Sequence, residues 1–165
     1  MLQRSDMNKS SWIFICLATI STLGLSQTIA DCKNPEGYAY YHHNLEKNKK
    51  TEFEKDKISG GMLSIQKNRD NTFDLIIVDS RKKITSMTQD GGKFLLLRKG
   101  ETDATFLLVF PNSSIELYTL WLDGKGNSKL DMLQSRGGDE TLLTAHKSSI
   151  LIANCESINF SLITN

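Results

Sequence analysis

The sequence predicts an all-β domain, either an antiparallel β-sandwich or a small up-and-down β-barrel of about 8–10 strands. Short runs of alternating apolar and polar residues recur roughly every 8 to 12 residues, separated by Gly, Asn and Asp as in hairpin turns. After residue 30, no stretch shows the sustained i, i+3, i+4 apolar spacing of an amphipathic helix. The pattern does not distinguish the two architectures.

The first expected strand is Tyr38–His43, preceded by the turn-like Asn34–Gly37. The charged run Glu46–Lys57 is expected to be an exposed loop, and it is no basic patch because its acidic residues offset its lysines. The remaining expected strands are Leu63–Gln66, Phe73–Ile77, Ile84–Thr88, Lys93–Arg98, Ala104–Phe110, Ile115–Leu122, Leu130–Gln134, Thr141–Ala145, Ser149–Asn154 and Ile158–Leu162.

Three central runs depart from clean alternation, because they are apolar on both faces. They are Phe94–Leu97, Phe106–Phe110 and Ile150–Ala153. Strands of an antiparallel sheet with one solvated face alternate apolar and polar residues. We therefore expect the second face of these strands to be covered. The candidates are the charged run, a partner chain such as a second copy in a homodimer, and a ligand.

Residues 1–30 are typical of a secretory signal peptide. Arg4 and Lys9 give a charged start, and the apolar run Trp12–Leu25 has 14 residues, which is shorter than the ~20 that a membrane-spanning helix needs. Thr28 and Ala30 occupy the two positions where signal peptidase requires small residues. Cleavage after Ala30 is predicted, and an uncleaved anchor is the alternative.

The expected mature chain is residues 31–165, which form one domain, because removing 30 residues from 165 leaves 135. Removing Arg4, Lys9 and Asp6 leaves 18 basic and 18 acidic side chains, from totals of 20 and 19. Zero net charge removes the electrostatic basis for binding nucleic acid or anionic membranes. The mature protein is expected to be exported, to the periplasm or outside the cell, without a stable membrane span.

The mature chain keeps two cysteines, Cys32 and Cys155, and an even count in an exported protein favours a disulfide. Closing a loop of 123 residues, the separation of the two positions, is worth about 5 kcal/mol in the chain-entropy model. Two unpaired buried thiols are the alternative. Two cysteines alone do not make a structural zinc site.

No catalytic, cofactor-binding or metal-binding constellation is predicted. The histidines are His42, His43 and His146, and one of the first two with His146 and a carboxylate is the remaining route to a metal site. His146, Asp139 and Ser148 or Ser149 do not carry the Gly-x-Ser-x-Gly elbow of a hydrolase. A polar connection between strands is favoured there.

Four aromatic residues are candidates for a binding surface: Tyr38, Tyr40, Tyr118 and Trp121. Tyr38 and Tyr40 share one face of a strand, whereas Tyr118 and Trp121 point to opposite faces. Tyrosine and tryptophan supply rigid contact area with a polar tip. The alternative is that they are the core and rim of an ordinary sheet.

Three segments resemble an uncharacterised family of small exported bacterial proteins. They are CKNPEGYAYY at Cys32–Tyr41, Gln134–Asp139 and Ala153–Cys155. The resemblance covers nearly the whole mature chain and implies export and a β-domain with paired cysteines. In a eukaryotic secreted protein, Asn112 and Asn159 would instead be glycosylation acceptors, since each begins Asn-x-Ser.

The expected function is binding, because the sequence offers a small stapled sheet and no catalytic constellation. An interaction protein of the periplasm, such as an inhibitor or an immunity protein, with another envelope protein as its partner, fits best. A lipocalin-like carrier of a small apolar ligand is the alternative. A hydrolase with an unrecognised site is a second alternative, which needs His42, His43 or His146 to meet acidic groups in a cleft.

Overall fold

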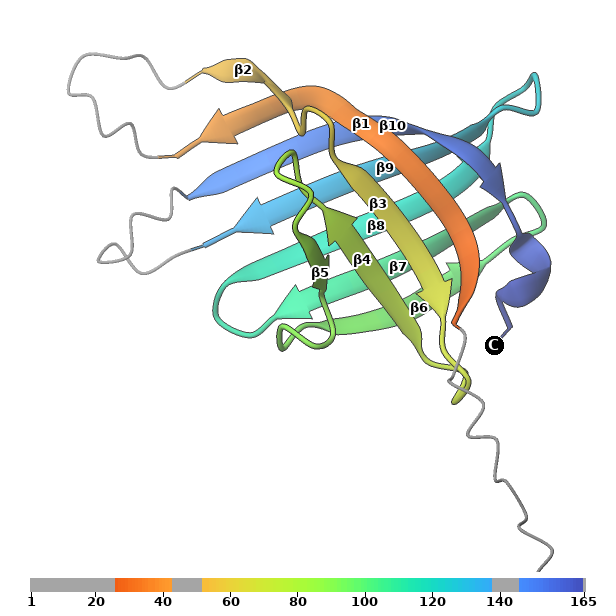
Figure 1. Cartoon of the computed structure of the whole chain (residues 1–165). Helices are drawn as coiled ribbons and strands as arrows, with labels where there is room; N and C mark the ends of the chain where they lie inside the picture. The colour runs from red at the N-terminus through yellow and green to blue at the C-terminus, as the bar shows by residue number, and fades with distance from the viewer. Residues whose placement is uncertain (1–25, 43–51, 138–145, 165) are drawn as a thin grey trace, which may run out of the picture.

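The computed structural model describes residues 26–42, 52–137 and 146–164, which form one curled antiparallel sheet (Figure 1). The all-β prediction is confirmed. The strands are β1 (Gln27–Tyr41), β2 (Phe53–Lys57), β3 (Met62–Lys67), β4 (Phe73–Val78), β5 (Ile84–Ser86), β6 (Lys93–Lys99), β7 (Asp103–Phe110), β8 (Ser114–Leu122), β9 (Ser128–Arg136) and β10 (Lys147–Ile158), and a 3₁₀ helix, η2 (Phe160–Leu162), follows.

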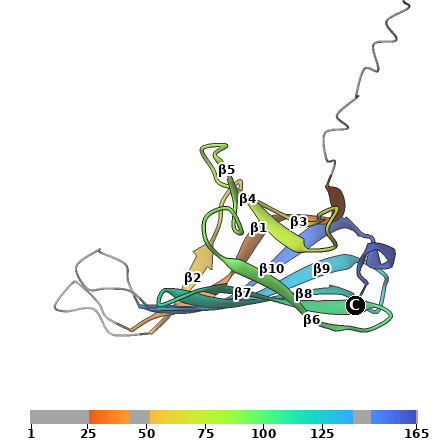
Figure 2. The same ribbon diagram turned by 90° about the horizontal axis from the view of Figure 1, so that it is seen from below.

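Strand β1 joins two meanders into a single sheet. The order is β5-β4-β3-β1-β10-β9-β8-β7-β6, and β2 pairs with β1 off this path. The sheet curls so that β3–β5 lie across the other strands (Figures 1 and 2). The rings of Phe73 on β4 and Phe106 on β7 meet at 5.3 Å although their strands are not neighbours in the sheet. The curl thus gives the sheet a concave face and a convex face.

The hydrophobic core fills the concave face. Phe94 stacks on Phe106 with ring centroids 5.1 Å apart, and Tyr118 meets Phe94 edge-on. Around them lie fully buried aliphatic side chains from both meanders, among them Leu63, Ile65, Leu75, Leu108, Leu120, Leu130 and Leu151. The side chains of the concave face pack against one another in one hydrophobic cluster.

Strand β1 differs most from expectation, because it begins at Gln27 and spans 15 residues. The segment Asn34–Gly37, expected to be a turn before the strand, lies within it. The pairing with β10 shifts between Lys33 and Glu36, and Asn34 adopts a φ of 50°. A bulge accommodates the proline, which has no N–H for the ladder. Gly37 then permits a close approach, because a Cβ there would lie 2.0 Å from the carbonyl oxygen of Ile150.

Two further expectations need correction. The end of the charged run was expected to be a loop but forms strand β2. Strand β3 pairs with β1 only up to Lys33, so the β1 residues from Glu36 onward can pair with Phe53–Lys57. Charged side chains are common on such edge strands. At the other end, β10 stops at Ile158, and η2 replaces the expected strand. The expected strand Thr141–Ala145 lies outside the described residues.

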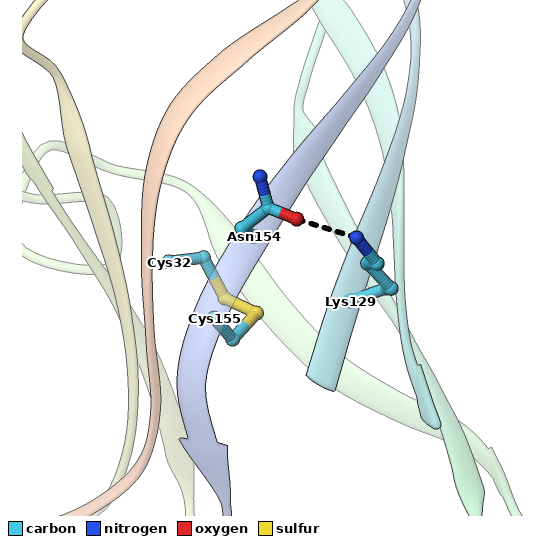
Figure 3. Close-up of a disulfide and its surroundings, with 4 residues drawn as sticks. All are labelled: Cys32, Lys129, Asn154 and Cys155. Carbon is cyan, nitrogen blue, oxygen red and sulfur yellow. Dashed lines mark hydrogen bonds between the residues drawn. A yellow bond between two sulfur atoms is a disulfide. The ribbon is translucent and has the colours of Figure 1, made fainter. Parts of the chain in front are cut away.

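The predicted disulfide is confirmed: Cys32 on β1 and Cys155 on β10 are bonded (Figure 3). The two residues are directly opposite each other in the ladder, with Cα atoms 3.9 Å apart. The side chain of Cys32 is completely buried in the core. The bond therefore fastens the strand that joins the two meanders to its neighbour.

The N-terminal part of β1 lies before the predicted cleavage point. Ile29 is 2% exposed and Ala30 is 1% exposed, and both belong to the hydrophobic core. The predicted cleavage after Ala30 would remove both residues from the core. Among the described residues, no helix has the length and apolar character needed to cross a membrane.

Replacing both cysteines, in Cys32→Ser/Cys155→Ser, is expected to lower the melting temperature by on the order of 10 °C. The bond closes a 123-residue separation, and its loss restores conformational freedom to the unfolded chain. Thermal unfolding under oxidising conditions measures the change. With reductant present, the wild type should melt close to the variant, and an oxidised wild type that melts with the variant would contradict a stabilising bridge.

Candidate binding surface

The convex face carries an unbroken apolar row across six strands. Tyr38 on β1 is opposite Ile150 on β10, which is opposite Leu133 on β9. The row continues through Leu117 on β8, Leu107 on β7 and Leu95 on β6, each directly opposite the one before it. Residues directly opposite in a ladder lie on the same face with their Cβ atoms about 5 Å apart. The six side chains are therefore neighbours in one line.

Apolar residues two positions along the same strands widen this row into a convex patch. The added residues are Ile152, Ile115, Val109 and Leu97. Seven of the ten side chains are between 43% and 56% exposed: Tyr38, Leu95, Leu97, Ile115, Leu133, Ile150 and Ile152. Contiguous apolar patches above a few hundred Å² are uncommon on monomeric proteins and mark sites of interaction. The second face predicted to be covered is thus open within the described residues.

Lysines border the patch where β2 runs beside β1. Lys55 is directly opposite Tyr38, and Lys57 is opposite Glu36. Alternation puts Glu54 and Asp56 on the other face, where Asp56 pairs with Lys147 at 2.5 Å. The charges of β2 cancel along the sequence but are separated by face in space. The alternation of Glu54 and Asp56 with Lys55 and Lys57 in the sequence predicts this separation once the segment is taken as a strand.

An open hollow of about 710 Å³ lies at this end of the patch. Its lining combines patch residues with polar groups: Asn34, Glu36, Gly37, Tyr38, Lys55, Asp56, Lys57, Lys129, Ile152 and Asn154. The Lys129 ammonium donates to the Asn154 side-chain oxygen at 2.5 Å (Figure 3). Within residues 26–42, 52–137 and 146–164, no ion pair joins Lys55 or Lys57 to a carboxylate. The lining contains three lysines, Lys55, Lys57 and Lys129, against the two carboxylates of Glu36 and Asp56, so the hollow has an excess of positive charge.

Three of the four candidate aromatic residues lie on the convex side. Tyr38 is 53% exposed and belongs to the patch. Tyr40 is half-buried beside it, with its ring 5.3 Å from Phe53 and 5.1 Å from His42. Trp121 is half-buried and lies opposite Lys129, which lines the hollow. Of these three aromatic side chains, Tyr38 lines the hollow.

The prediction that Tyr118 belongs to a binding surface is wrong, because this residue lies in the core and is completely buried. Its position, three residues from Trp121, puts it on the opposite face, where Phe94 packs against it. The hydroxyl donates to the buried carboxylate of Glu116, which also accepts a hydrogen bond from the Gln134 amide at 2.6 Å. Burial, and then the Glu116 charge, raise the pKa of Tyr118 well above its usual value. The residue therefore has a structural role.

The described residues bring His42 and Ser148 together. The His42 ring nitrogen Nε2 lies 3.0 Å from the Ser148 hydroxyl, and the His42 backbone N–H donates to the His146 carbonyl. Nucleophilic catalysis also needs an oxyanion-binding site beside the nucleophile. The His42 side chain is exposed and Ser148 is half-buried. Ser149 instead donates to Gln134 on the concave face. His43 and Asp139 lie outside the described residues.

Within the described ranges, no three His, Cys, Asp or Glu side chains lie together in a group that could hold a metal ion. Asn159, one of the two conditional glycosylation positions, accepts hydrogen bonds through its side-chain oxygen from the backbone N–H and hydroxyl of Ser161. Asn112 lies in the exposed turn between β7 and β8 with a φ of 63°.

Comparison with family models, with curated proteins and with solved structures finds no match to this chain. The geometry of the convex patch and its hollow therefore carries the functional argument.

Replacing the buried hydroxyl, in Tyr118→Phe, is expected to lower the free energy of unfolding by about 1–3 kcal/mol at neutral pH, because Glu116 loses a donor. The raised pKa of Tyr118 also makes stability fall with rising pH above about 10, where the unfolded chain releases a proton that the folded chain retains. Urea unfolding from pH 7 to 11 measures both effects.

The free energy of unfolding of Tyr118→Phe should decrease less than that of the wild type as the pH rises from 7 to 11. Tyr38→Phe removes a hydroxyl from an exposed tyrosine and is the matched control. Equal stability of Tyr118→Phe and the wild type at neutral pH would contradict the network.

Proposed function

We propose that this protein is an exported interaction protein that binds another protein through its convex patch. The observation that carries the proposal is the apolar row that crosses six strands in direct register from Tyr38 to Leu95. A small inhibitor or immunity protein of the periplasm is the class of protein that fits. The proposed function rests on a surface and requires no reacting group.

The extent of the patch supports a protein partner. A stable interface buries about 800 Å² on each partner, with an apolar centre and a polar rim. Seven half-exposed apolar side chains, including Tyr38 at one end, supply such a centre. Tyrosine is also one of the residue types enriched among those that carry most of the binding energy of an interface. The sheet beneath is pinned by the Cys32–Cys155 bond, so little ordering is needed on binding.

The charges at the rim favour a partner with carboxylates beside its own apolar surface. Lys55, Lys57 and Lys129 line the hollow next to the patch. Of the two carboxylates in the same lining, Asp56 is paired with Lys147, whereas Glu36 lies opposite Lys57. A carboxylate of the partner in the hollow would gain charge-assisted hydrogen bonds while its apolar neighbours cover the row.

A second copy of this chain is a poorer occupant. In a two-fold interface, each protomer presents the same patch. Cations flank both ends of the patch, with Lys55 beside Tyr38 and the exposed Lys93 two residues before Leu95. Two patches lying along each other would bring Lys55 near its own counterpart or near Lys93 of the second copy, and like charges repel.

Export is supported by the redox chemistry of the chain. Disulfides persist in oxidising compartments and are rare where glutathione and thioredoxin keep thiols reduced. The Cys32–Cys155 bond joins directly opposite residues of neighbouring strands and has a buried sulfur. A disulfide between directly paired strands with a buried sulfur has a structural role.

The substitution Leu133→Asp, which puts a charge at the centre of the apolar row, tests whether the row binds the partner. Proteins from the producing organism's envelope are captured on the wild type, purified and measured by calorimetry. We expect the dissociation constant of the true partner to rise at least tenfold with Leu133→Asp, since the charge is buried unpaired in the interface. The control is Ile84→Asp on β5, because Ile84 is 71% exposed and lies outside the patch.

The hollow is tested by the charge reversal Lys55→Glu/Lys57→Glu. This variant should weaken binding several-fold at low salt and less at high salt, because salt screens the exposed charges. Lys125→Glu, in the exposed turn between β8 and β9, is the control and should bind as the wild type does. A partner bound equally by all four variants, or only a homodimer in analytical ultracentrifugation, would overturn the proposal.

A further inference from the structure

We infer that signal peptidase cuts this chain after Ser26, so that the exported protein begins at Gln27. The inference rests on the proposed export of the chain but uses a different part of the molecule from the convex patch. It concerns the start of β1, where the structure and the expected cleavage after Ala30 disagree.

Residues 27–30 are an integral part of the sheet. The backbones of Gln27, Thr28 and Ala30 pair with β3, and Ala30 also pairs with Ile158 on β10. The carbonyl of Ile29 accepts the backbone N–H of Asn159 at 2.8 Å. This part of β1 thus holds together the first meander, the end of β10 and the start of the C-terminal segment.

The side chains give the same result. Ile29 and Ala30 are almost completely buried and lie in the core with Leu63, Ile65 and Ile163. Cleavage after Ala30 would remove the Ile29 side chain and leave a gap among these residues. Core positions that lose a whole side chain are among the most destabilising sites in a protein. Residues that the fold buries in this way belong to the mature protein.

Ser26 is the last residue before the ladder begins. It is exposed, and its hydroxyl donates to the Gln66 side chain at 2.7 Å. A cut after Ser26 removes one exposed hydrogen bond and leaves every pair of the β1–β3 ladder intact. A cut after Ala30 lies inside that ladder.

The sequence around Ser26 also meets the requirement of the enzyme. Signal peptidase reads small residues at the last and third-last positions of the signal. Ser26 and Gly24 occupy these two positions, with Leu25 between them. The apolar run then extends from Trp12 to Leu23, which is 12 residues and within the usual 7–15 of a signal peptide. Both the recognition residues and the fold therefore support the same bond.

The test is the intact mass of the mature protein after export of the full chain from a bacterial host. We expect the mass of residues 27–165, or that mass less one ammonia where the N-terminal glutamine has cyclised. A mass of residues 31–165 would overturn this inference and leave export standing. If all of the protein had the mass of the full chain, the inference would be overturned, and recovery of that uncleaved chain in the cytoplasm would overturn the proposed export as well.

Two matched substitutions separate the possible cuts. Ser26→Leu puts a large residue at the last position of the inferred signal, and it should leave the precursor unprocessed. Thr28→Leu alters only the third-last position of the alternative signal. Thr28 is exposed, so the fold tolerates the change, and processing should continue as in the wild type. Normal processing of Ser26→Leu, or a block in Thr28→Leu, would overturn the inference.

Discussion

The double role of β1 is the constraint on which the rest of the structure depends. One edge of this strand pairs with β10, and the other pairs first with β3 and then with β2. Through it the two meanders become one sheet, and the curl of that sheet brings Phe73 against Phe106 to close the core. The Cys32–Cys155 bond fastens β1 to β10 at this junction, where loss of the pairing would separate the two halves of the core.

The same registration determines what the outer face presents. Because β1, β10, β9, β8, β7 and β6 are in step, single apolar residues on six strands fall into one line. Leaving such a line in water forgoes about 25 cal/mol for each Å² of apolar surface that a partner would cover. The polar concave network around Glu116 is, in contrast, satisfied within the chain. The unmet interaction therefore lies on the convex side.

The sequence predicted what depends on local periodicity and chemistry. The alternation in segments such as Phe73–Ile77, and the two-sided apolar runs such as Phe94–Leu97, identified strands and an unusual second face. The disulfide followed from an even number of cysteines. Position along a strand also separates Tyr118 from Trp121, although only packing shows that Tyr118 is buried.

Features that depend on long-range pairing were not predictable in this way. The bulge at Asn34, the extension of β1 back to Gln27 and the strand character of Phe53–Lys57 all arise from the edges that β3 and β10 offer. The registration that aligns Tyr38 with Leu95 across the sheet is set by five ladders together, so no single segment encodes it. The separation of lysines from carboxylates on β2 follows only once that strand is known.

The central claim is that another protein covers the convex patch, and native mass spectrometry of the protein purified from its own host tests it most directly. We expect a complex with a second, different protein in a fixed ratio, and the loss of that complex when Ile150, which lies in the row beside Tyr38 and is 56% exposed, is replaced by Asp. A retained small molecule, a homodimer, or a second protein that remains bound to Ile150→Asp would contradict it.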